Sequence, residues 1–184
     1  MKELLTPRDD IFVVRNFLTP EECQEQIAKC EAVGFAEAPV IGPSGPFINK
    51  GMRNNERVIV DDFATADWMF ERIKKYLPES YGEASGVNER FRYYRYEPGQ
   101  YFDWHFDAAY KTSELTFMVY LNDDFTGGTT DFHFGERFRD DDPIIQAKPE
   151  KGMALLFVHN VLHRGAPVLT GKKYVMRSDI MYPA

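Results

Sequence analysis

Two residues that could bind one metal ion stand two positions apart near the middle of the chain. His105 and Asp107 end the stretch Arg-Tyr-Glu-Pro-Gly-Gln-Tyr-Phe-Asp-Trp-His-Phe-Asp, which begins at Arg95. If this stretch is a strand, both side chains leave on the same face, because successive side chains of a strand alternate. A second imidazole from elsewhere would complete a two-histidine, one-carboxylate site with open positions, the arrangement that suits non-haem Fe(II). The pair therefore predicts half of a metal centre.

Three further histidines compete to supply the second imidazole, namely His133, His159 and His163. His133 follows a Gly-Gly pair in a polar, aromatic segment, so we expect it to be structural or to face a substrate. His159 ends the apolar run 153–158, where a buried, hydrogen-bonded histidine is the ordinary outcome. His163 is too far from His105 in the sequence for spacing to say whether the two meet. An isolated His-x-Asp is also common by chance, so the metal site needs a wider pattern.

Such a pattern extends over the second half of the chain. It consists of Tyr-x-x-Gly-Gln-x-x-x-x-His-x-Asp at 96–107, Thr-x-x-x-Tyr-Leu-x-Asp at 116–123, Gly-Gly at 127–128 and His-x-Gly-x-Pro-Val-x-x-Gly-x-Lys at 163–173. In this order the motifs resemble those of the iron(II)/2-oxoglutarate oxygenases of the prolyl 4-hydroxylase type. The resemblance implies that His105, Asp107 and His163 bind Fe(II), and that the remaining positions of the metal accept a co-substrate and dioxygen.

The resemblance also implies which residues bind 2-oxoglutarate, whose distal carboxylate needs a cation. Lys173 matches the lysine of the family's Gly-x-Lys, and we favour it as the anchor. Arg177 is the alternative: in a strand it would share the face of Lys173, it is the better bidentate partner for a carboxylate, and its Arg-Ser-Asp run is similar to the Arg-x-Ser of other 2-oxoglutarate oxygenases. Tyr96 occupies the position whose hydroxyl hydrogen-bonds the co-substrate, and Thr116 matches the family's threonine. Aromatic residues in strands are, however, more often core residues than cofactor contacts.

Three cofactors are implied by the resemblance, Fe(II), 2-oxoglutarate and O2, and ascorbate is left open as a fourth. The implied reaction hydroxylates an unactivated C–H bond and releases succinate and CO2. Asp107 favours hydroxylation, because halogenating relatives carry a small residue at that position. The substrate would be a peptidyl proline or a small, amino-acid-like molecule, and Arg53, Asn54 and Arg57 could hold its carboxylate or form an ion-paired rim. The alternative function is a metal-binding jelly roll without oxygenase activity, either a sensor or a zinc-dependent relative.

Length and composition limit the possible classes of protein. The chain has 184 residues, 43% of them hydrophobic, which fits one domain with a sizeable core. Its formal net charge of -7 disfavours a nucleic-acid-binding groove, which needs a basic surface. No apolar run at the N-terminus has the length of a signal peptide, and no later run has the length of a membrane span. We therefore expect a cytoplasmic protein with neither a nucleic-acid nor a membrane partner, and its oligomeric state stays open.

Helices that could support this site are indicated in the first half of the chain. After a first strand at Ile11–Val14, Thr19 is a good helix N-cap, followed by Pro20 at the first helical position and by Glu22, which completes a capping box. A second helix is predicted over residues 64–77, ended by Pro78. Between the two helices, residues 34–51 are rich in Gly and Pro and predict a long loop with a functional or mobile role.

Strands follow the helices, which decides the predicted fold class. Short runs rich in aromatic and β-branched residues, separated by turn residues, predict strands at 58–60, 91–96, 101–106, 115–121, 129–134, 153–158 and 174–182. Residues 135–149 would be a lid or a surface loop. The pattern predicts a mainly β protein with N-terminal helices (α+β), a jelly roll flanked by helices; the resemblance implies the corresponding double-stranded β-helix. Residues 1–88 would form the helical support and loop region of a single domain, and residues 89–184 its catalytic jelly-roll core.

Overall fold

The computed structural model describes residues 1–7, 10–109, 112–133 and 142–183. Within these residues the protein is mainly β with two α-helices, as the sequence predicts. The helices are α1 (Pro20–Val33) and α2 (Phe63–Ile73), with 3-10 turns η1 (Lys74–Tyr76) and η2 (Glu79–Tyr81). The strands are β1 (Lys2–Leu4), β2 (Ile11–Val14), β3 (Ala36–Glu37), β4 (Val40–Gly42), β5 (Gly45–Phe47), β6 (Glu56–Asp61), β7 (Gly86–Val87), β8 (Arg90–Tyr96), β9 (Phe102–His105), β10 (Ser113–Tyr120), β11 (Thr126–Gly127), β12 (Thr130–His133), β13 (Ile144–Ala147), β14 (Ala154–Val158), β15 (His163–Gly165), β16 (Val168–Thr170) and β17 (Lys173–Met181).

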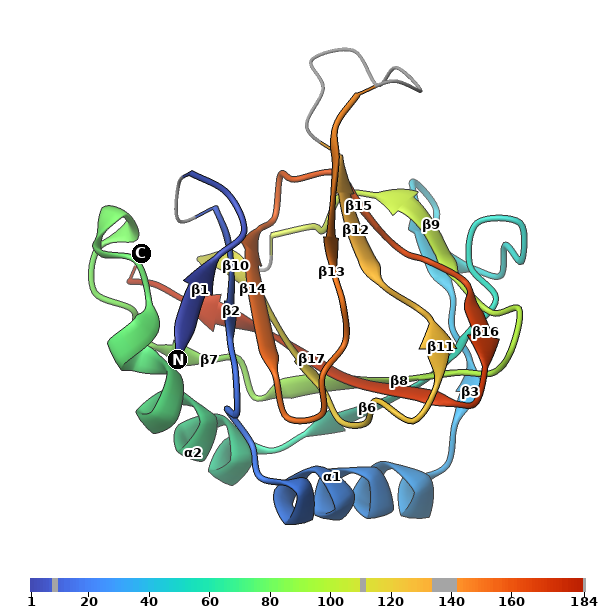
Figure 1. The fold of residues 1–184 in the computed structure, drawn as a ribbon, viewed down its shortest axis with the longest axis horizontal. Helices are drawn as coiled ribbons and strands as arrows, with labels where there is room; N and C mark the ends of the chain where they lie inside the picture. The colour runs from blue at the N-terminus through green and yellow to red at the C-terminus, as the bar shows by residue number, and fades with distance from the viewer. Residues whose placement is uncertain (8–9, 110–111, 134–141, 184) are drawn as a thin grey trace.

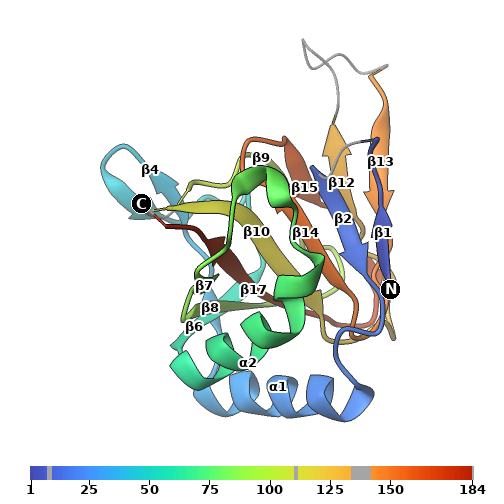
Figure 2. The ribbon, with the colours of Figure 1, turned by 90° about the vertical axis from the view of Figure 1, so that its left-hand side faces the viewer.

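Two antiparallel sheets of unequal size contain most of these strands. The large sheet has nine strands in the order β1-β2-β14-β10-β17-β8-β6-β3, with β7 paired to β17 outside this path. The small sheet has four strands in the order β13-β12-β15-β9, and the pairs β11-β16 and β4-β5 form separate ribbons. Figures 1 and 2 show β9, β12 and β15 on the side of the molecule away from both helices. The small sheet thereby brings two distant segments, 102–105 and 163–165, next to each other.

Helix α1 begins where its local sequence predicts. The Thr19 side chain accepts a hydrogen bond from the backbone N–H of Glu22 (3.2 Å), and the Glu22 carboxylate accepts one from the backbone N–H of Thr19 (2.9 Å). This reciprocal pair satisfies two of the amide groups that every helix leaves unpaired at its start. The helix ends at Val33, and its C-cap Gly34 has a φ of 93°, a conformation that residues with a side chain rarely adopt.

Helix α2 is shorter than the sequence predicts. Asp62 caps its start by accepting a hydrogen bond from the backbone N–H of Thr65 (2.9 Å), and the α-helical geometry gives way to a 3-10 turn after Ile73. At its centre, Met69 is fully buried and Trp68 is only partly buried. The α-helix therefore ends before the predicted residue 77, although Tyr76 and Leu77 still pack against the core.

The two faces of the large sheet bury different sets of residues. In β10, Leu115, Phe117 and Val119 belong to the core cluster that includes residues of α1 and α2. The alternate residues Met118 and Tyr120 belong to a second cluster, which includes Phe132 of the small sheet. This alternation with a period of two is the side-chain geometry of a strand. The large sheet is thus covered on one face by the helices and on the other by the small sheet.

Several predicted boundaries need correction. Strand β9 ends at His105, so the strand predicted to run through residue 106 is too long. Residues Ile144–Ala147, predicted as part of a lid or loop, form β13 of the small sheet, while residues 135–141 lie outside the described part of the chain. The predicted long loop 34–51 contains the short strands β3, β4 and β5. Strand β13 has four residues, and β3, β4 and β5 have two or three each, too few to give a clear period in the sequence.

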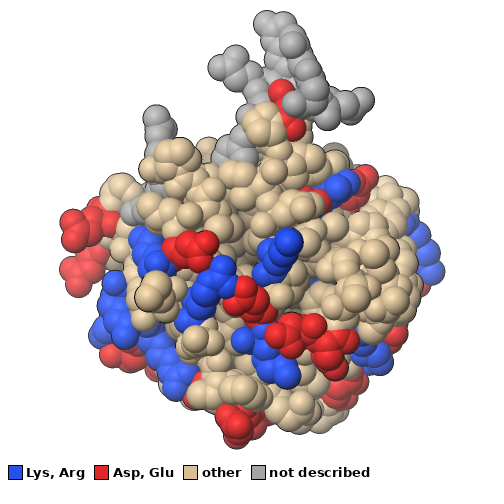
Figure 3. Space-filling view, in the orientation of Figure 1, with Lys and Arg blue, Asp and Glu red and all other residues tan. Residues whose placement is uncertain are grey.

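The surface in the orientation of Figure 1 has mixed charge. Figure 3 shows Lys and Arg side chains interspersed with Asp and Glu side chains over this face. Among the described residues, none of the helices has the length and apolar character that crossing a bilayer requires.

Candidate metal centre

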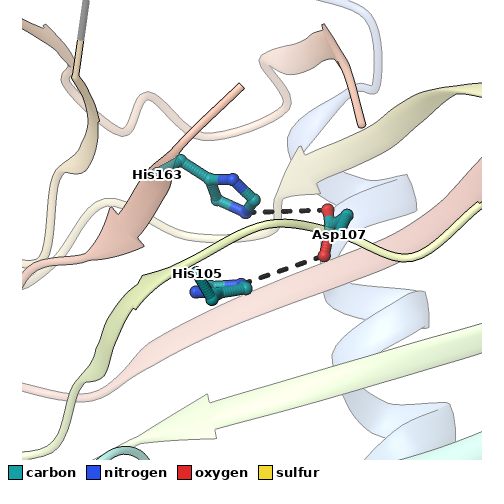
Figure 4. A group of neighbouring side chains, drawn as sticks. All are labelled: His105, Asp107 and His163. Atoms are coloured by element: carbon teal, nitrogen blue, oxygen red, sulfur yellow. Dashed lines mark ion pairs between the residues drawn. The ribbon is translucent and has the colours of Figure 1, made fainter. Parts of the chain in front are cut away.

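Three side chains from different parts of the chain converge at one end of the small sheet. His105 in β9 and His163 in β15 stand opposite each other in the strand register. One possible ligand atom from each histidine and one from Asp107 all lie within 4.8 Å of one another. Figure 4 shows both imidazole rings directed at the Asp107 carboxylate. Among the described residues, these three are the one set of His, Cys, Asp and Glu side chains close enough together to hold a metal ion.

Hydrogen bonds to the backbone fix the tautomer of both imidazoles. The Nδ1 atom of His105 lies 2.7 Å from the carbonyl oxygen of Asp103, and Nδ1 of His163 lies 2.9 Å from that of Val161. Because a carbonyl oxygen only accepts, each Nδ1 carries the hydrogen and each Nε2 presents its lone pair. The Nε2 atoms face the Asp107 oxygens at 3.8 Å for His105 and 3.6 Å for His163.

Burial keeps both rings neutral. It lowers the pKa of His105 to about 3, with a further contribution from the neighbouring His163, and it also lowers the pKa of His163. Neutral imidazole is the form that binds a metal ion, and a second hydrogen bond from Nδ1–H to a carbonyl is the usual support of such a ligand.

Asp107 is held by a loop rather than by strand β9. Its backbone N–H donates to the carbonyl oxygen of His159 (3.2 Å), two residues beyond the end of the strand. Its Oδ2 atom accepts a hydrogen bond from the Thr116 hydroxyl (2.6 Å) and lies 3.0 Å from a terminal nitrogen of Arg177. Burial alone would raise the pKa of Asp107, but Arg177 and the two histidines hold it well below the usual value. The carboxylate is therefore ionised.

The donor set fits a divalent cation. Two imidazole lone pairs and one carboxylate face a common point, and lone pairs that face one another repel unless a cation lies between them. Two nitrogen ligands and one carboxylate oxygen, with space for further ligands, are the donors expected of a non-haem Fe(II) site.

A buried hydrogen-bond network lies behind Asp107. Thr116, expected from the sequence at the co-substrate, gives its hydroxyl hydrogen to Asp107, so it accepts from Nδ1 of His159 (3.0 Å). Nε2 of His159 in turn lies 3.0 Å from the Ser113 hydroxyl. His159 is thus the buried, hydrogen-bonded histidine that the sequence predicts. His133 lies elsewhere, edge-on to Trp104.

An inner cavity extends from the three converging side chains to Lys173, past Tyr94, Tyr96 and Met118. The ammonium group of Lys173 is buried, donates to the carbonyl oxygen of Gly128 (2.7 Å), and lies 5.0 Å from the ring centre of Tyr96. Burial lowers the pKa of Lys173 to about 7. In the described part of the chain, no carboxylate lies within ion-pair distance of this ammonium group.

Gly128 makes room for Lys173. It has a φ of +63°, and a Cβ atom added there would lie 3.2 Å from Cδ of Lys173. A side chain at this position would therefore both strain the backbone and crowd the lysine. The geometry of the cavity thus explains the second glycine of the Gly-Gly pair noted in the sequence.

Arg177 lines the same cavity but has protein partners already. It pairs with Asp107 and with Asp179, at 3.0 Å and 3.3 Å. Burial alone would lower the pKa of Arg177, but Asp107, Tyr94 and Asp179 raise it above its ordinary value. The two candidate anchors thus differ: carboxylates of the protein balance the charge of Arg177, and no such carboxylate pairs with Lys173 in the described residues.

The residues named as candidate substrate contacts divide into two groups. Arg53 and Arg57 line a second, outer cavity that also borders His105. Asn54 instead accepts a hydrogen bond from the backbone N–H of Tyr101 (2.8 Å). Sequence reasoning missed Arg92, which lines the outer cavity as well. Its spacing of two from Tyr94 would have placed it on the same face of the strand.

Sequence comparison relates the chain to one family of oxygenases. Residues 91–178 match the family described as the 2OG-Fe(II) oxygenase superfamily. A probable prolyl 4-hydroxylase 6 from Arabidopsis thaliana is 30% identical over 92% of this chain and 67% of its own length. A putative prolyl 4-hydroxylase from Acanthamoeba polyphaga mimivirus is 26% identical over 92% of this chain and 73% of its own length.

Solved structures share the fold. A Pseudomonas putida prolyl-4-hydroxylase superposes with a TM-score of 0.68 at 15% identity, covering 95% of this chain and 94% of the other. A prolyl hydroxylase from Trichoplax adhaerens, in complex with a peptide fragment of the hypoxia inducible factor oxygen degradation domain, superposes with a TM-score of 0.69 at 16% identity, covering 94% and 83%.

Proposed function

Since this chain belongs to the 2OG-Fe(II) oxygenase superfamily, prolyl 4-hydroxylase type, and is therefore a 2-oxoglutarate-dependent hydroxylase, we propose that it hydroxylates an unactivated C–H bond of a peptidyl proline or a small, amino-acid-like molecule. Succinate and CO2 would be the co-products. The family implies Fe(II), 2-oxoglutarate and O2 as cofactors. A dependence of turnover on ascorbate would decide whether ascorbate joins them.

His105, Asp107 and His163 would hold the iron. The observation that carries this assignment is the convergence of two neutral Nε2 atoms and one ionised carboxylate within 4.8 Å. Bound Fe(II) would supply the coupling of oxidative decarboxylation of 2-oxoglutarate to hydroxylation of the substrate. Thr116 and Arg177 would orient the metal-binding carboxylate, since both contact Oδ2 of Asp107.

Lys173 would anchor the distal carboxylate of 2-oxoglutarate, with Tyr96 beside it. A buried ammonium group without a carboxylate partner among the described residues is costly, and a bound carboxylate would compensate it. Arg177 is the weaker candidate because Asp107 and Asp179 already share its charge. The apolar and aromatic neighbours of Lys173 would exclude water and so strengthen the ion pair.

The two stacked sheets support a double-stranded β-helix, or jelly roll, as the fold. Residues 89–184 would then be the catalytic core of a single domain and residues 1–88 its support, because α1 and α2 cover the face of the large sheet opposite the site. The support region also contributes Arg53 and Arg57 to the cavity, so its role would extend to the substrate.

Location and partners are further parts of the proposal. The net charge of -7 and the mixed charge of the face in Figure 3 support a protein without a nucleic-acid partner. A cytoplasmic location would be tested by fractionation of cells that express the protein, and the oligomeric state by light scattering.

Formation of the iron chelate tests the proposed function directly. Anaerobic addition of Fe(II) and 2-oxoglutarate should give the weak visible charge-transfer band of the chelate, and admission of O2 should then produce succinate. His133→Ala is the matched control, because it removes a histidine outside the converging group. A protein that binds Fe(II) but gives neither the band nor succinate would instead be a metal-binding jelly roll without oxygenase activity.

A further inference from the structure

An outer cavity adjoins the candidate metal centre and is large enough for a small molecule. Its volume is about 340 Å³, at the lower end of the range for small-molecule sites. His105, Asp107 and Arg177 border both this cavity and the inner one. The outer cavity extends from there to Ile41 of strand β4 and to Met52. It is therefore the space in which a substrate would lie beside the metal.

Four arginines line this outer cavity, and only two of them have carboxylate partners in the described part of the chain. Arg92 pairs with Asp179 (3.2 Å), and Arg177 pairs with Asp107 and Asp179. Arg53 and Arg57 have no such partner among the described residues. The cofactors would not remove this excess of positive charge, because the charges of Fe(II) and 2-oxoglutarate are equal and opposite.

Arg53 is held rigidly with one donor group unused. Its side chain is only 4% exposed, and its guanidinium carbon lies 4.3 Å from the ring centre of Phe102 and 4.7 Å from that of Tyr94. Its Nε donates to the Asn55 side chain (2.7 Å), while its buried NH2 group has no hydrogen-bond partner among the described residues. Phe102 in turn stacks on the His105 ring with a centroid distance of 3.5 Å. One aromatic ring thus separates this unused donor from a metal-binding side chain.

Arg57 projects from the neighbouring strand into the same cavity. It stands opposite Tyr94 in the pairing of β6 with β8, as Ile59 stands opposite Arg92. Burial lowers the pKa of Arg57; the neighbouring Tyr94 opposes this effect, and the charges of Arg53 and Arg92 add to it. A half-buried cation next to cations of the same sign is unfavourable without an anion.

We propose that the substrate is a small molecule with a carboxylate group, which Arg53 and Arg57 bind in the outer cavity so that its target C–H bond lies beside His105 and Asp107. This rests on the proposed hydroxylase function and selects the small-molecule substrate over a neutral peptidyl proline. A carbonyl oxygen of a neutral substrate can accept one hydrogen bond from the unused NH2 group of Arg53, but it leaves the charges of Arg53 and Arg57 without a counter-charge. A carboxylate supplies that charge and accepts two parallel hydrogen bonds from a guanidinium group.

Calorimetric titration with matched pairs of neutral and anionic probes tests the proposal. The probes are N-acetyl amino acids and the corresponding N-acetyl amino-acid amides, which differ in charge but hardly in shape. They are added to the protein loaded with 2-oxoglutarate and Zn(II), which replaces Fe(II) and prevents turnover. At least one acid should bind tenfold or more tightly than its amide. Equal binding within every pair, or no binding of any acid, would overturn the proposal, as would tighter binding of inorganic phosphate than of every acid.

Variants assign the preference to the two arginines. Arg53→Met and Arg57→Met should each reduce the affinity for the acid at least tenfold and leave that for the amide unchanged. Arg90→Met is the matched control, because Arg90 lies on the same strand as Arg92 but pairs with Asp61 at the surface. If Arg53→Met does not fold, Arg53→Lys keeps a cation without the planar fork and should still lose part of the preference. Retention of the full preference in both the Arg53 and Arg57 variants would contradict their role.

The same titration separates this proposal from the proposed function. A protein that prefers the acid over the amide but forms no iron chelate would keep the carboxylate site and lose the hydroxylase assignment. A protein that forms the chelate but shows no preference would keep the hydroxylase assignment and lose the carboxylate site.

Discussion

The two faces of the large sheet are built from the same strands but carry different chemistry. In β8, Phe91 and Tyr93 belong to the cluster under the helices, whereas Arg92 and Tyr94 line the outer cavity. In β17, Met176 lies in the cluster under the helices and the next residue, Arg177, contacts Asp107. A shift of one residue along a strand therefore separates a residue that stabilises the fold from one that serves the site. Substitutions on the helix face should lower the stability of the fold, whereas substitutions on the site face should lower the binding of Fe(II) or 2-oxoglutarate.

The metal-binding side chains should show this separation most strongly. His105→Ala, Asp107→Ala and His163→Ala should each abolish Fe(II) binding and turnover, because each removes one of three protein ligands. The two histidine variants should leave the unfolding transition nearly unchanged, whereas Asp107→Ala should also lower stability, because Arg177 and Thr116 lose a buried partner. Equilibrium dialysis with Fe(II) and chemical denaturation check the two expectations. If His133→Ala or His159→Ala removes the iron while His163→Ala does not, the third ligand has been assigned to the wrong histidine.

Phe117 offers the opposite experiment on the helix face. Its side chain is 1% exposed and packs edge-on against Phe17, so Phe117→Ala should leave a cavity and lower the free energy of unfolding by about 3 to 5 kcal/mol. Urea denaturation measures this loss. The affinity for Fe(II) of the folded fraction should remain that of the unaltered protein. A large loss of iron affinity with little loss of stability would break the comparison between the faces.

Within the site face, variants of Lys173 and Arg177 can be compared for their loss of 2-oxoglutarate binding. Loss of the true anchor leaves a carboxylate of 2-oxoglutarate unpaired, which should cost about 2 to 5 kcal/mol of binding. We expect that cost in Lys173→Ala, and a smaller one in Arg177→Ala, in titrations of the chelate band. A normal titration in Lys173→Ala together with a collapsed one in Arg177→Ala would make Arg177 the anchor.

The pH dependence distinguishes the two anchors without a mutation. Because the pKa of Lys173 is lowered to about 7, its ammonium form is lost as the pH rises through 7, and the affinity for 2-oxoglutarate should fall. The pKa of Arg177 is raised, so an Arg177 anchor would stay charged and give no such fall. Stability without 2-oxoglutarate should change in the opposite direction. The unfolded chain binds the Lys173 proton more tightly than the folded one, so the free energy of unfolding should rise as the pH rises from about 7 toward the ordinary pKa of lysine.

Thr116 should give the smallest of these effects. Thr116→Val keeps the shape of the side chain and removes the hydrogen bond to Oδ2 of Asp107. Loss of such support to a metal ligand typically lowers metal affinity about tenfold to a hundredfold. Thr126→Val is the control, since the Thr126 hydroxyl bonds only to Thr170 at the surface in the described structure. Equal iron affinity in the two variants would remove Thr116 from the support of the site.

Sequence reasoning succeeded where the signal was local. The capping box of Thr19 and Glu22 and the apolar run Ile11–Val14 depend on residues a few positions apart, and both are present in the structure as predicted. Short strands such as Ile144–Ala147 were missed because four residues with a partly exposed pattern give no clear period.

Contacts between segments far apart in the sequence limited how much of the site could be predicted. The pairing of His105 with His163 depends on the register of two distant strands, so only the family resemblance indicated it. The contact of Thr116 with Asp107 likewise depends on how the loop after β9 returns to β10. The spacing of His105 and Asp107 suggested a strand, but the chain leaves the sheet after His105 and a hydrogen bond to the His159 backbone places the carboxylate.

The position of β9 at the edge of the small sheet has a consequence for how that sheet holds together. Only β15 flanks β9 within this sheet, and the two strands carry His105 and His163 at opposite points of their pairing. Among the described residues, the other side of β9 meets no strand, only residues 52–54, through an isolated bridge between Arg53 and Phe102 and a hydrogen bond from the Asp103 backbone N–H to the Met52 carbonyl oxygen (2.8 Å). An edge held by so few contacts is a place where a fold can open locally. An ion bound by both histidines and Asp107 would stabilise the pairing of β9 with β15, because an ion that binds only the paired form lowers the population of the form in which the strands have separated. Metal capture and closure of the sheet edge would then be a single event.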